Sequence, residues 1–152
     1  MTTTDEYMLL LKSLDDSVFW QWPPGFDLGA AERKFLSFAS ALQQQLTTIC
    51  TIETGALIQD ASFRGQIVLP DFLLQQLPQE YAVVIRVSNW GNIATVSDEQ
   101  TLQPFVLTTI KDLMQQFGYV YIPSDLLNTP YTGKNPGVTG IRTWWIRYFD
   151  WV

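Results

Sequence analysis

The pattern of apolar and polar positions is most distinct in residues 81–97, YAVVIRVSNWGNIATVS. Residues 82–87 are apolar except for one arginine, and they are rich in the β-branched types that suit a pleated sheet. Turn-forming residues follow at 89–92, where Gly91 can take a positive φ, and the β pattern resumes at 93–96. This stretch predicts a β-hairpin whose first strand is apolar on both faces and therefore central in a sheet.

Two segments near the N-terminus have the periodicity of amphipathic helices. A capping box of Thr3 and Glu6, followed by apolar residues at helical spacing, predicts a helix over 4–14. Asp27 is a candidate N-cap for a second and longer helix over about 28–48, which carries a single apolar stripe.

Shorter β segments precede the hairpin. Residues 49–59 have β character, and Phe63, Gly65 and Ile67 alternate with polar residues, so we expect a strand with those three positions facing the core. Residues 60–62 would join the two strands as a hairpin.

The segment after the hairpin predicts a third helix and a further strand. Capping and acidic residues at 97–100 indicate the start of the helix, Pro104 is tolerated only near that start, and Gly118 ends it. Residues 119–122 have the pattern of a short strand, and 125–128 that of a single helical turn.

The chain ends in IRTWWIRYFDWV, residues 141–152. Aromatic and β-branched residues dominate this segment, which predicts a final strand docked in the sheet. Arg142 and Arg147 would then lie on opposite faces, so that at least one is available to a carboxylate of this protein or of a partner.

Together these elements predict one α+β domain over residues 1–152. Consecutive strand pairs favour an antiparallel sheet of about five or six strands, with the helices packed mainly on one face. A length of 152 residues is that of a single domain with one substantial core.

The charge balance narrows the class of partner. The 15 acidic residues outnumber the 9 lysines and arginines, for a net charge of −6, and no basic cluster could neutralise several phosphates. We therefore expect neither nucleic acid nor an anionic membrane as a partner, but a protein, with a basic one favoured by the charge. No signal-peptide pattern and no stretch of membrane-spanning length is present, which predicts a cytoplasmic protein.

The chain has few of the residues on which catalysis depends. It has no histidine, and its one cysteine, Cys50, lies where a helix meets a strand, as a buried structural cysteine would. Gly133 and Lys134 lack the other residues of a phosphate-binding loop. We expect no cofactor, no metal and no enzymatic activity. The alternative is a hydrolase or isomerase that uses paired carboxylates, for which Asp15–Asp16 and Asp98–Glu99 are candidates.

Aromatic residues are the remaining signal, because they make up 14% of the chain and include six tryptophans. The aromatic stretch 18–26 predicts either a plug over one end of the core or an exposed contact patch. Trp90 lies within a turn, where it either anchors a partner or folds back over the sheet edge. The candidate binding residues are Trp20, Trp22, Trp90, Tyr131, Lys134, Arg142, Trp144 and Arg147.

These observations favour a non-catalytic protein-interaction module of the immunity, chaperone or adaptor type that acts through an aromatic-rich surface. The alternative is a small-ligand-binding domain with a pocket beside the irregular loop 129–140. Self-association through an exposed edge or the aromatic tail is compatible with either function.

Overall fold

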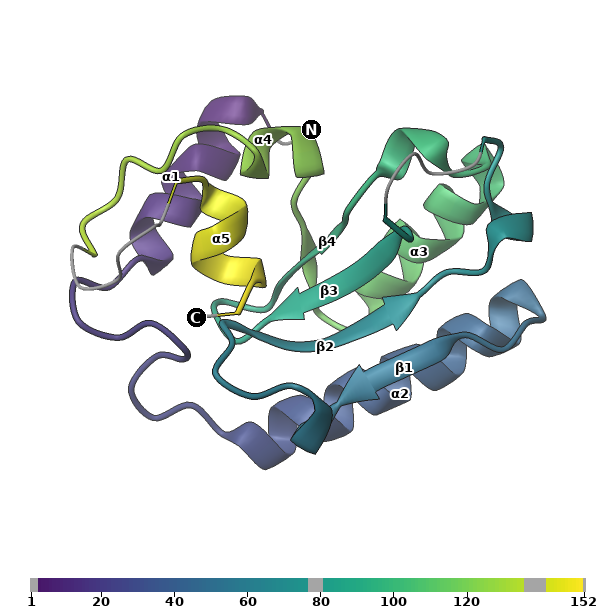
Figure 1. Cartoon of the computed structure of the whole chain (residues 1–152), viewed down its shortest axis with the longest axis horizontal. Helices are drawn as coiled ribbons and strands as arrows, with labels where there is room; N and C mark the ends of the chain where they lie inside the picture. Colours follow the sequence, from purple (N-terminus) through teal and green to yellow (C-terminus); the bar gives the residue numbers. More distant parts are fainter. Residues whose placement is uncertain (1–2, 77–80, 136–141, 152) are drawn as a thin grey trace.

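A computed structural model describes residues 3–76, 81–135 and 142–151 of the chain (Figure 1). Its α-helices are α1 (Thr4–Leu14), α2 (Leu28–Leu46), α3 (Pro104–Gln116), α4 (Ser124–Leu127) and α5 (Trp144–Phe149). Its strands are β1 (Thr51–Thr54), β2 (Phe63–Val68), β3 (Val84–Ser88), β4 (Ile93–Val96) and β5 (Val120–Tyr121). Short 3₁₀ helices cover Gly55–Leu57, Asp71–Leu73 and Glu99–Thr101. The α+β class is confirmed.

The strands form one sheet in the order β1-β2-β3-β4-β5. The first four strands are antiparallel, but β5 pairs with β4 in parallel, with Ile93 opposite Val120 and Ala94 opposite Tyr121. The expectation of a purely antiparallel sheet was therefore wrong. Helix α3 lies between β4 and β5 in the chain, and such a helical crossover returns the chain to the same end of the sheet, so that the next strand runs parallel.

The central hairpin is confirmed. Strand β3 pairs with both β2 and β4, and the turn between β3 and β4 is closed by a hydrogen bond of 3.2 Å from the Ile93 amide to the Trp90 carbonyl. Gly91 and Asn92 both have φ of 56°, as the tight turns that match the twist of a hairpin require.

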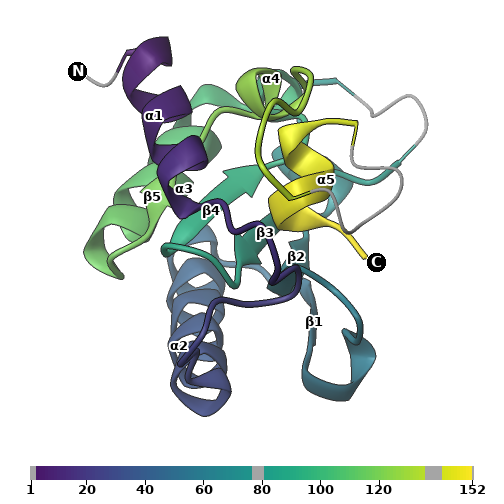
Figure 2. The ribbon, with the colours of Figure 1, turned by 90° about the vertical axis from the view of Figure 1, so that its left-hand side faces the viewer.

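Helices cover both faces of the sheet, which corrects the expectation that they gather mainly on one. Helices α2 and α3 pack with Ile67, Ile85 and Val96 in one core cluster. Helices α1, α4 and α5 pack with Phe63 and Ile93 in a second cluster, on the opposite side of the sheet from α2 (Figure 2). The second face needs this cover because it also carries large apolar side chains.

The C-terminal segment forms helix α5 rather than the strand that its composition predicts. Trp144, Arg147 and Tyr148 follow the i, i+3, i+4 spacing of one helical face, and all three are buried. Thr143 caps the N-terminus by accepting a hydrogen bond of 3.3 Å from the Ile146 amide. Arg142 precedes the helix and is exposed, so the two arginines do not lie on opposite faces of a strand.

Side chains of β3 donate hydrogen bonds to the C-terminal end of α5. Arg86 donates from Nη1 to the Phe149 carbonyl at 2.6 Å, and the Ser88 hydroxyl donates to the Tyr148 carbonyl at 2.8 Å. These carbonyls belong to the last turn of the helix, where no backbone donor is available. The sheet therefore supplies the hydrogen bonds that a six-residue helix cannot make by itself.

The first two helices follow the sequence closely, whereas the third begins later than expected. Both halves of the Thr3–Glu6 capping box are formed, and Asp27 caps α2. Helix α3 begins at Pro104, because Glu99–Thr101 form a separate 3₁₀ turn before it. Among the described residues, no helix has both the length and the apolar character needed to cross a bilayer.

Strand β2 departs from its predicted alternation at one point. A β-bulge shifts the register between Phe63, which lies opposite Ser88, and Gly65, which lies opposite Val87. Phe63 therefore packs in the second core cluster while Ile67 packs in the first. The expected grouping of Phe63, Gly65 and Ile67 on one face was wrong because the bulge adds one residue, Arg64, to the strand.

Candidate functional site

The eight residues singled out in the sequence divide between the interior and the surface. Trp20, Trp90, Trp144 and Arg147 are 7%, 3%, 0% and 0% exposed, so they are part of the core. The exposed members are Trp22, Lys134 and Arg142, and Tyr131 is half-buried.

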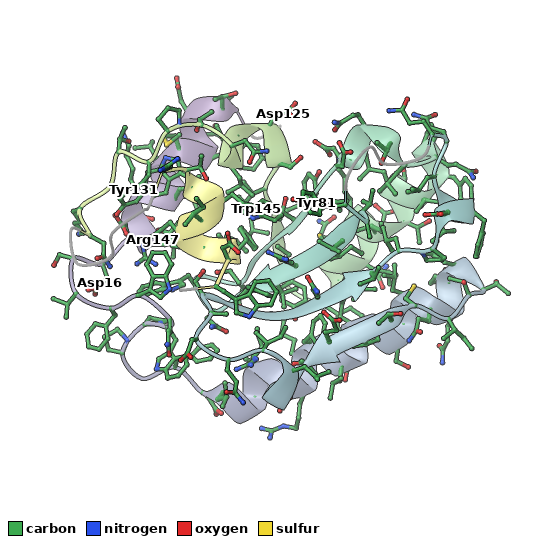
Figure 3. The ribbon with its side chains drawn as sticks, in the orientation of Figure 1. Asp16, Tyr81, Asp125, Tyr131, Trp145 and Arg147 are labelled. Atoms are coloured by element: carbon green, nitrogen blue, oxygen red, sulfur yellow. The ribbon has the colours of Figure 1, made fainter. Side chains whose placement is uncertain are left out.

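Asp15 and Arg147 form a buried ion pair at one end of the molecule. Arg147 Nε donates to Asp15 Oδ1 at 2.7 Å, and the other carboxylate oxygen accepts from the Tyr131 hydroxyl at 2.6 Å and from the Lys134 amide at 2.7 Å. Figure 3 shows Arg147 on α5 with Tyr131 close to it on the preceding loop. Both carboxylate oxygens are thus engaged, which a buried charge requires.

The same guanidinium holds the aromatic stretch that follows α1. Arg147 Nη2 and Nη1 donate to the carbonyls of Phe19 and Trp20 at 3.0 and 3.1 Å. The Trp90 indole also donates to the Trp20 carbonyl, at 3.0 Å. Arg147 lies 4.5 Å from the centre of the Trp90 ring and 4.9 Å from that of Tyr148, within the range of cation–π attraction.

Within the aromatic stretch 18–26, only Trp20 is buried as a plug over the core would be, whereas Val18 and Phe19 before it are exposed. Trp20 is buried beneath the Asp15–Arg147 pair, and Trp90 folds back into the core instead of projecting from its turn. Burial and the hydrogen bond to Asp15 raise the pKa of Tyr131 to about 12, so the phenol remains protonated and donates at neutral pH. The ion pair is a structural centre that joins three distant segments.

Trp22, two residues further along, is exposed instead. It is 43% exposed and stacks on Phe26 with ring centres 6.3 Å apart and planes inclined by 18°. Trp22 lines a hollow of about 420 Å³ between the start of α2 and the segment that joins β1 to β2. We call this the Trp22 hollow, and its other lining residues include Leu28, Glu32, Asp60, Phe63 and Arg64.

Two of the three charged residues that line the Trp22 hollow are acidic. Glu32 accepts a hydrogen bond of 3.4 Å from the Thr54 hydroxyl, and Asp60 accepts one of 3.3 Å from the Gln21 amide. Asp60 is exposed and has φ of 51°, a left-handed conformation that aspartate tolerates better than most residues. Arg64 is buried and donates from Nη2 to the Ile58 carbonyl at 3.2 Å.

The acidic pairs considered for catalysis are each engaged with their own neighbours. Asp15 belongs to the buried ion pair, and Asp16 accepts hydrogen bonds from the Phe19 and Val18 amides, which lower the pKa of its carboxyl. Glu99 accepts a hydrogen bond from the Tyr121 hydroxyl, whose pKa burial raises.

Cys50 is buried, as its position in the sequence predicts, and burial raises the pKa of its thiol. Within residues 3–76, 81–135 and 142–151, no three histidine, cysteine, aspartate or glutamate side chains gather as metal ligands would.

The loop 129–140 is described only as far as residue 135. In that part, Asn135 donates from Nδ2 to the Phe19 carbonyl at 3.0 Å, and its backbone amide donates to the Tyr131 hydroxyl at 2.8 Å. These polar groups face the ion pair and fix the aromatic stretch. The ligand pocket expected beside this loop stays a prediction, because residues 136–140 lie outside the described residues.

The sequence analysis identified one member of the Trp22 hollow, Trp22 itself. Glu32, Asp60 and Arg64 were missed because they are far apart in the chain and each alone resembles an ordinary surface residue. Arg64 gave no signal, because it stood at a polar position of the alternation predicted for its strand. Comparisons of this chain with protein-family models, with curated proteins and with solved structures found no match.

Proposed function

We propose that this protein is a non-catalytic protein-interaction module, of the immunity, chaperone or adaptor type, that contacts a basic partner through the Trp22 hollow. The observation that carries the proposal is the exposed Trp22 ring beside the carboxylates of Glu32 and Asp60. An indole face with nearby carboxylates is suited to a lysine or arginine side chain, which it can bind by cation–π attraction and by ion pairing.

The aromatic part of the hollow supports an anchoring role. Tryptophan is enriched among the residues that contribute most to protein–protein affinity. Because Trp22 already stacks on Phe26, its ring loses little conformational freedom when a partner binds. Leu28 and Leu57 are also exposed in this region and would add apolar contact area around the ring.

The charge of the molecule supports a basic partner. Glu32 and Asp60 add negative charge at the hollow, and the whole chain has a net charge of −6. A field of this sign attracts a positively charged surface over distances of about a Debye length and accelerates its association. The affinity should therefore fall when the salt concentration rises.

A non-catalytic role is supported by how the chain uses its acidic groups. Asp15 and Asp16 hold the aromatic stretch in place, and Glu99 is hydrogen-bonded to Tyr121. In each case the carboxylate has a structural partner close in space. A pair of free carboxylates at catalytic spacing is the arrangement that would favour the hydrolase or isomerase alternative.

The proposal can be tested with capped hexapeptides that differ only in one central residue, which is arginine, glutamine or glutamate. Binding to the full-length protein is followed through the indole N–H resonances, with that of Trp22 assigned by its loss in Trp22→Phe. We expect the arginine peptide alone to shift the Trp22 resonance saturably, and more weakly as salt is added. Equal binding of all three peptides would contradict the proposal.

Variants of the full-length protein locate the binding surface. Trp22→Ala and Asp60→Asn should each weaken arginine-peptide binding by about tenfold, the loss expected for an anchor residue or a charge-assisted contact. Phe105→Ala is the matched control, because Phe105 is an exposed aromatic residue on α3 and does not line the hollow. Unchanged binding by Trp22→Ala would place the contact elsewhere.

A further inference from the structure

A second and smaller hollow lies beside the Trp22 hollow and differs from it in charge. It has a volume of about 190 Å³ and is bounded by α2, by the bulge of β2 and by the turn of the β3–β4 hairpin. Its charged lining residues are Lys34 and Arg64, and no carboxylate lines it. We call it the Lys34–Arg64 hollow. Arg64 also lines the Trp22 hollow, so one side chain borders both.

The bulge in β2 explains the position of Arg64. As the extra residue between Phe63 and Gly65, Arg64 has no direct partner in the β2–β3 register. Bulges commonly redirect a side chain away from the alternation of the strand, and they occur often beside binding sites. Gly65 next to it lets the Phe35 ring of α2 approach the strand closely, which brings α2 and Lys34 to the same side.

The charge of Arg64 is buried without an ion-pair partner. Arg64 is 6% exposed, its Nε has no hydrogen-bond acceptor, and its Nη2 donates only to a backbone carbonyl. The two ion pairs between described residues are Arg86–Asp150 and Arg147–Asp15, and neither includes Arg64. Glu32 acts on this charge only from beyond ion-pair distance, so an anion bound in contact with the guanidinium would stabilise it further.

Lys34 adds a second cation with unused donors. Its ammonium lies 4.2 Å from the centre of the Tyr119 ring and donates to Asn92 Oδ1 at 3.2 Å. An ammonium has three N–H donors, so this contact leaves others for a ligand. Burial lowers the pKa of Lys34, which is a further sign that an anion beside it would be favourable.

We propose that the Lys34–Arg64 hollow binds one carboxylate group, held between the ammonium of Lys34 and the guanidinium of Arg64. The volume of the hollow equals that of about six water molecules, which suits a carboxylate on a short stem. Asn89 also lines the hollow, and its buried Oδ1 is an acceptor without a partner, so it calls for a donor on the ligand beside the anionic group. The carboxylate comes either from a free small acid or from an acidic side chain of a peptide.

Titration of the ¹⁵N-labelled full-length protein tests this site with three probes: sodium acetate, N-acetylglutamate N-methylamide and inorganic phosphate. Sodium chloride at equal ionic strength is the reference. We expect both carboxylates to shift the amide resonances of residues 88–92 and the Arg64 Nε–H resonance saturably. Similar affinities for the two would indicate a free acid, and at least about tenfold tighter binding of the capped glutamate would indicate a peptide side chain. Tighter binding of phosphate, or no saturation beyond chloride, would overturn the proposal.

Variants separate this site from the Trp22 hollow. Lys34→Gln and Arg64→Gln should each weaken carboxylate binding by about tenfold or more, because each removes a charge-assisted hydrogen bond. Arg33→Gln is the matched control, since Arg33 is the neighbouring exposed cation of α2 and does not line the hollow. Because Lys34 is half-exposed, Lys34→Gln should fold normally, and it tests the site even if Arg64→Gln does not fold. Carboxylate binding that survives Lys34→Gln unchanged would overturn the proposal.

This inference goes beyond the proposed function, and binding at the two hollows can be tested separately because the proposed ligands have opposite charge. Arg64→Gln should weaken carboxylate binding yet preserve or strengthen binding of the arginine peptide, since it removes a positive charge from the Trp22 hollow. Trp22→Ala should weaken binding of the arginine peptide and leave carboxylate binding unchanged.

Discussion

Arg147 donates from Nε to Asp15 Oδ1 at 2.7 Å, and the two side chains are 0% and 1% exposed although 132 positions separate them in the chain. This pair links the end of α1 to helix α5 and, through Tyr131, to the loop between α4 and α5. Through the same guanidinium it also holds the Phe19 and Trp20 carbonyls against α5.

The first prediction concerns this ion pair. Arg147→Met and Asp15→Asn should each lower the free energy of unfolding by about 3–5 kcal/mol, because each leaves an uncompensated polar group or charge in the interior. Urea denaturation measures the loss. The double variant should lose less than the sum of the two. Arg142→Ala, at an exposed position, should change stability by less than about 0.5 kcal/mol. Additive losses in the double variant would mean that the two residues act independently.

The second prediction contrasts two tryptophans. Trp90→Ala should lower stability by about 3–5 kcal/mol, as severely as a truncation such as Ile85→Ala, because Trp90 is a core residue. Trp22→Ala removes mainly a stacking contact and should cost about 0.5–1.5 kcal/mol. Thermal unfolding followed by far-UV circular dichroism compares them. A Trp22 variant as unstable as the Trp90 variant would show that Trp22 too belongs to the core.

The third prediction is a loss of stability at alkaline pH. The pKa of Tyr131 is raised to about 12 in the folded protein, above the value of about 10 in an unfolded chain. The tyrosinate is therefore disfavoured by the fold, so this stabilisation is complete below pH 10 and is lost as the pH rises through 12. Burial raises the pKa of Tyr119 and Tyr148 in the same direction.

Urea midpoints between pH 8 and 11.5 should follow this decline. Tyr131→Phe should be less stable by about 1–3 kcal/mol at neutral pH, because Asp15 loses a donor, and its stability should fall less steeply above pH 10. Tyr81→Phe, at an exposed tyrosine, serves as the control. An identical alkaline slope in Tyr131→Phe would argue against the assigned pKa.

The fourth prediction tests the close approach of α2 to the sheet. A Cβ at Gly65 would lie 2.4–2.6 Å from three atoms of the Phe35 ring. Gly65→Ala should therefore destabilise the protein by about 1–3 kcal/mol through overpacking. A Cβ at Gly29, in the first turn of α2, would meet the flexible end of Arg33 at 3.2 Å and Asp27 Oδ1 at an ordinary contact distance of 3.7 Å, so Gly29→Ala should be neutral or stabilise by up to about 1 kcal/mol. Equal melting temperatures for both variants would contradict the tight packing at Gly65.

The sequence by itself determined the elements that depend on neighbouring residues. The Thr3–Glu6 capping box, the Asp27 cap and the tight turn at Gly91 each act over a few positions, so α1, the start of α2 and the central hairpin could be predicted. Trp22 was likewise identified as a candidate contact residue, although nothing local distinguished it from Trp20.

The tertiary structure alone decided the partners of residues far apart in the chain. Whether a tryptophan is buried depends on which segments pack against it. Arg147 lies against the Trp90 ring and donates a hydrogen bond to the Phe19 carbonyl, which holds the segment 15–20 beside Trp90. The final segment has the composition of a strand, but it becomes α5 since β3 supplies donors for its last carbonyls. The Trp22 hollow and the Lys34–Arg64 hollow form only when the β2 bulge at Arg64 packs beside α2. Local sequence cannot encode such contacts, because their free energy arises from packing between segments that the chain brings together only on folding.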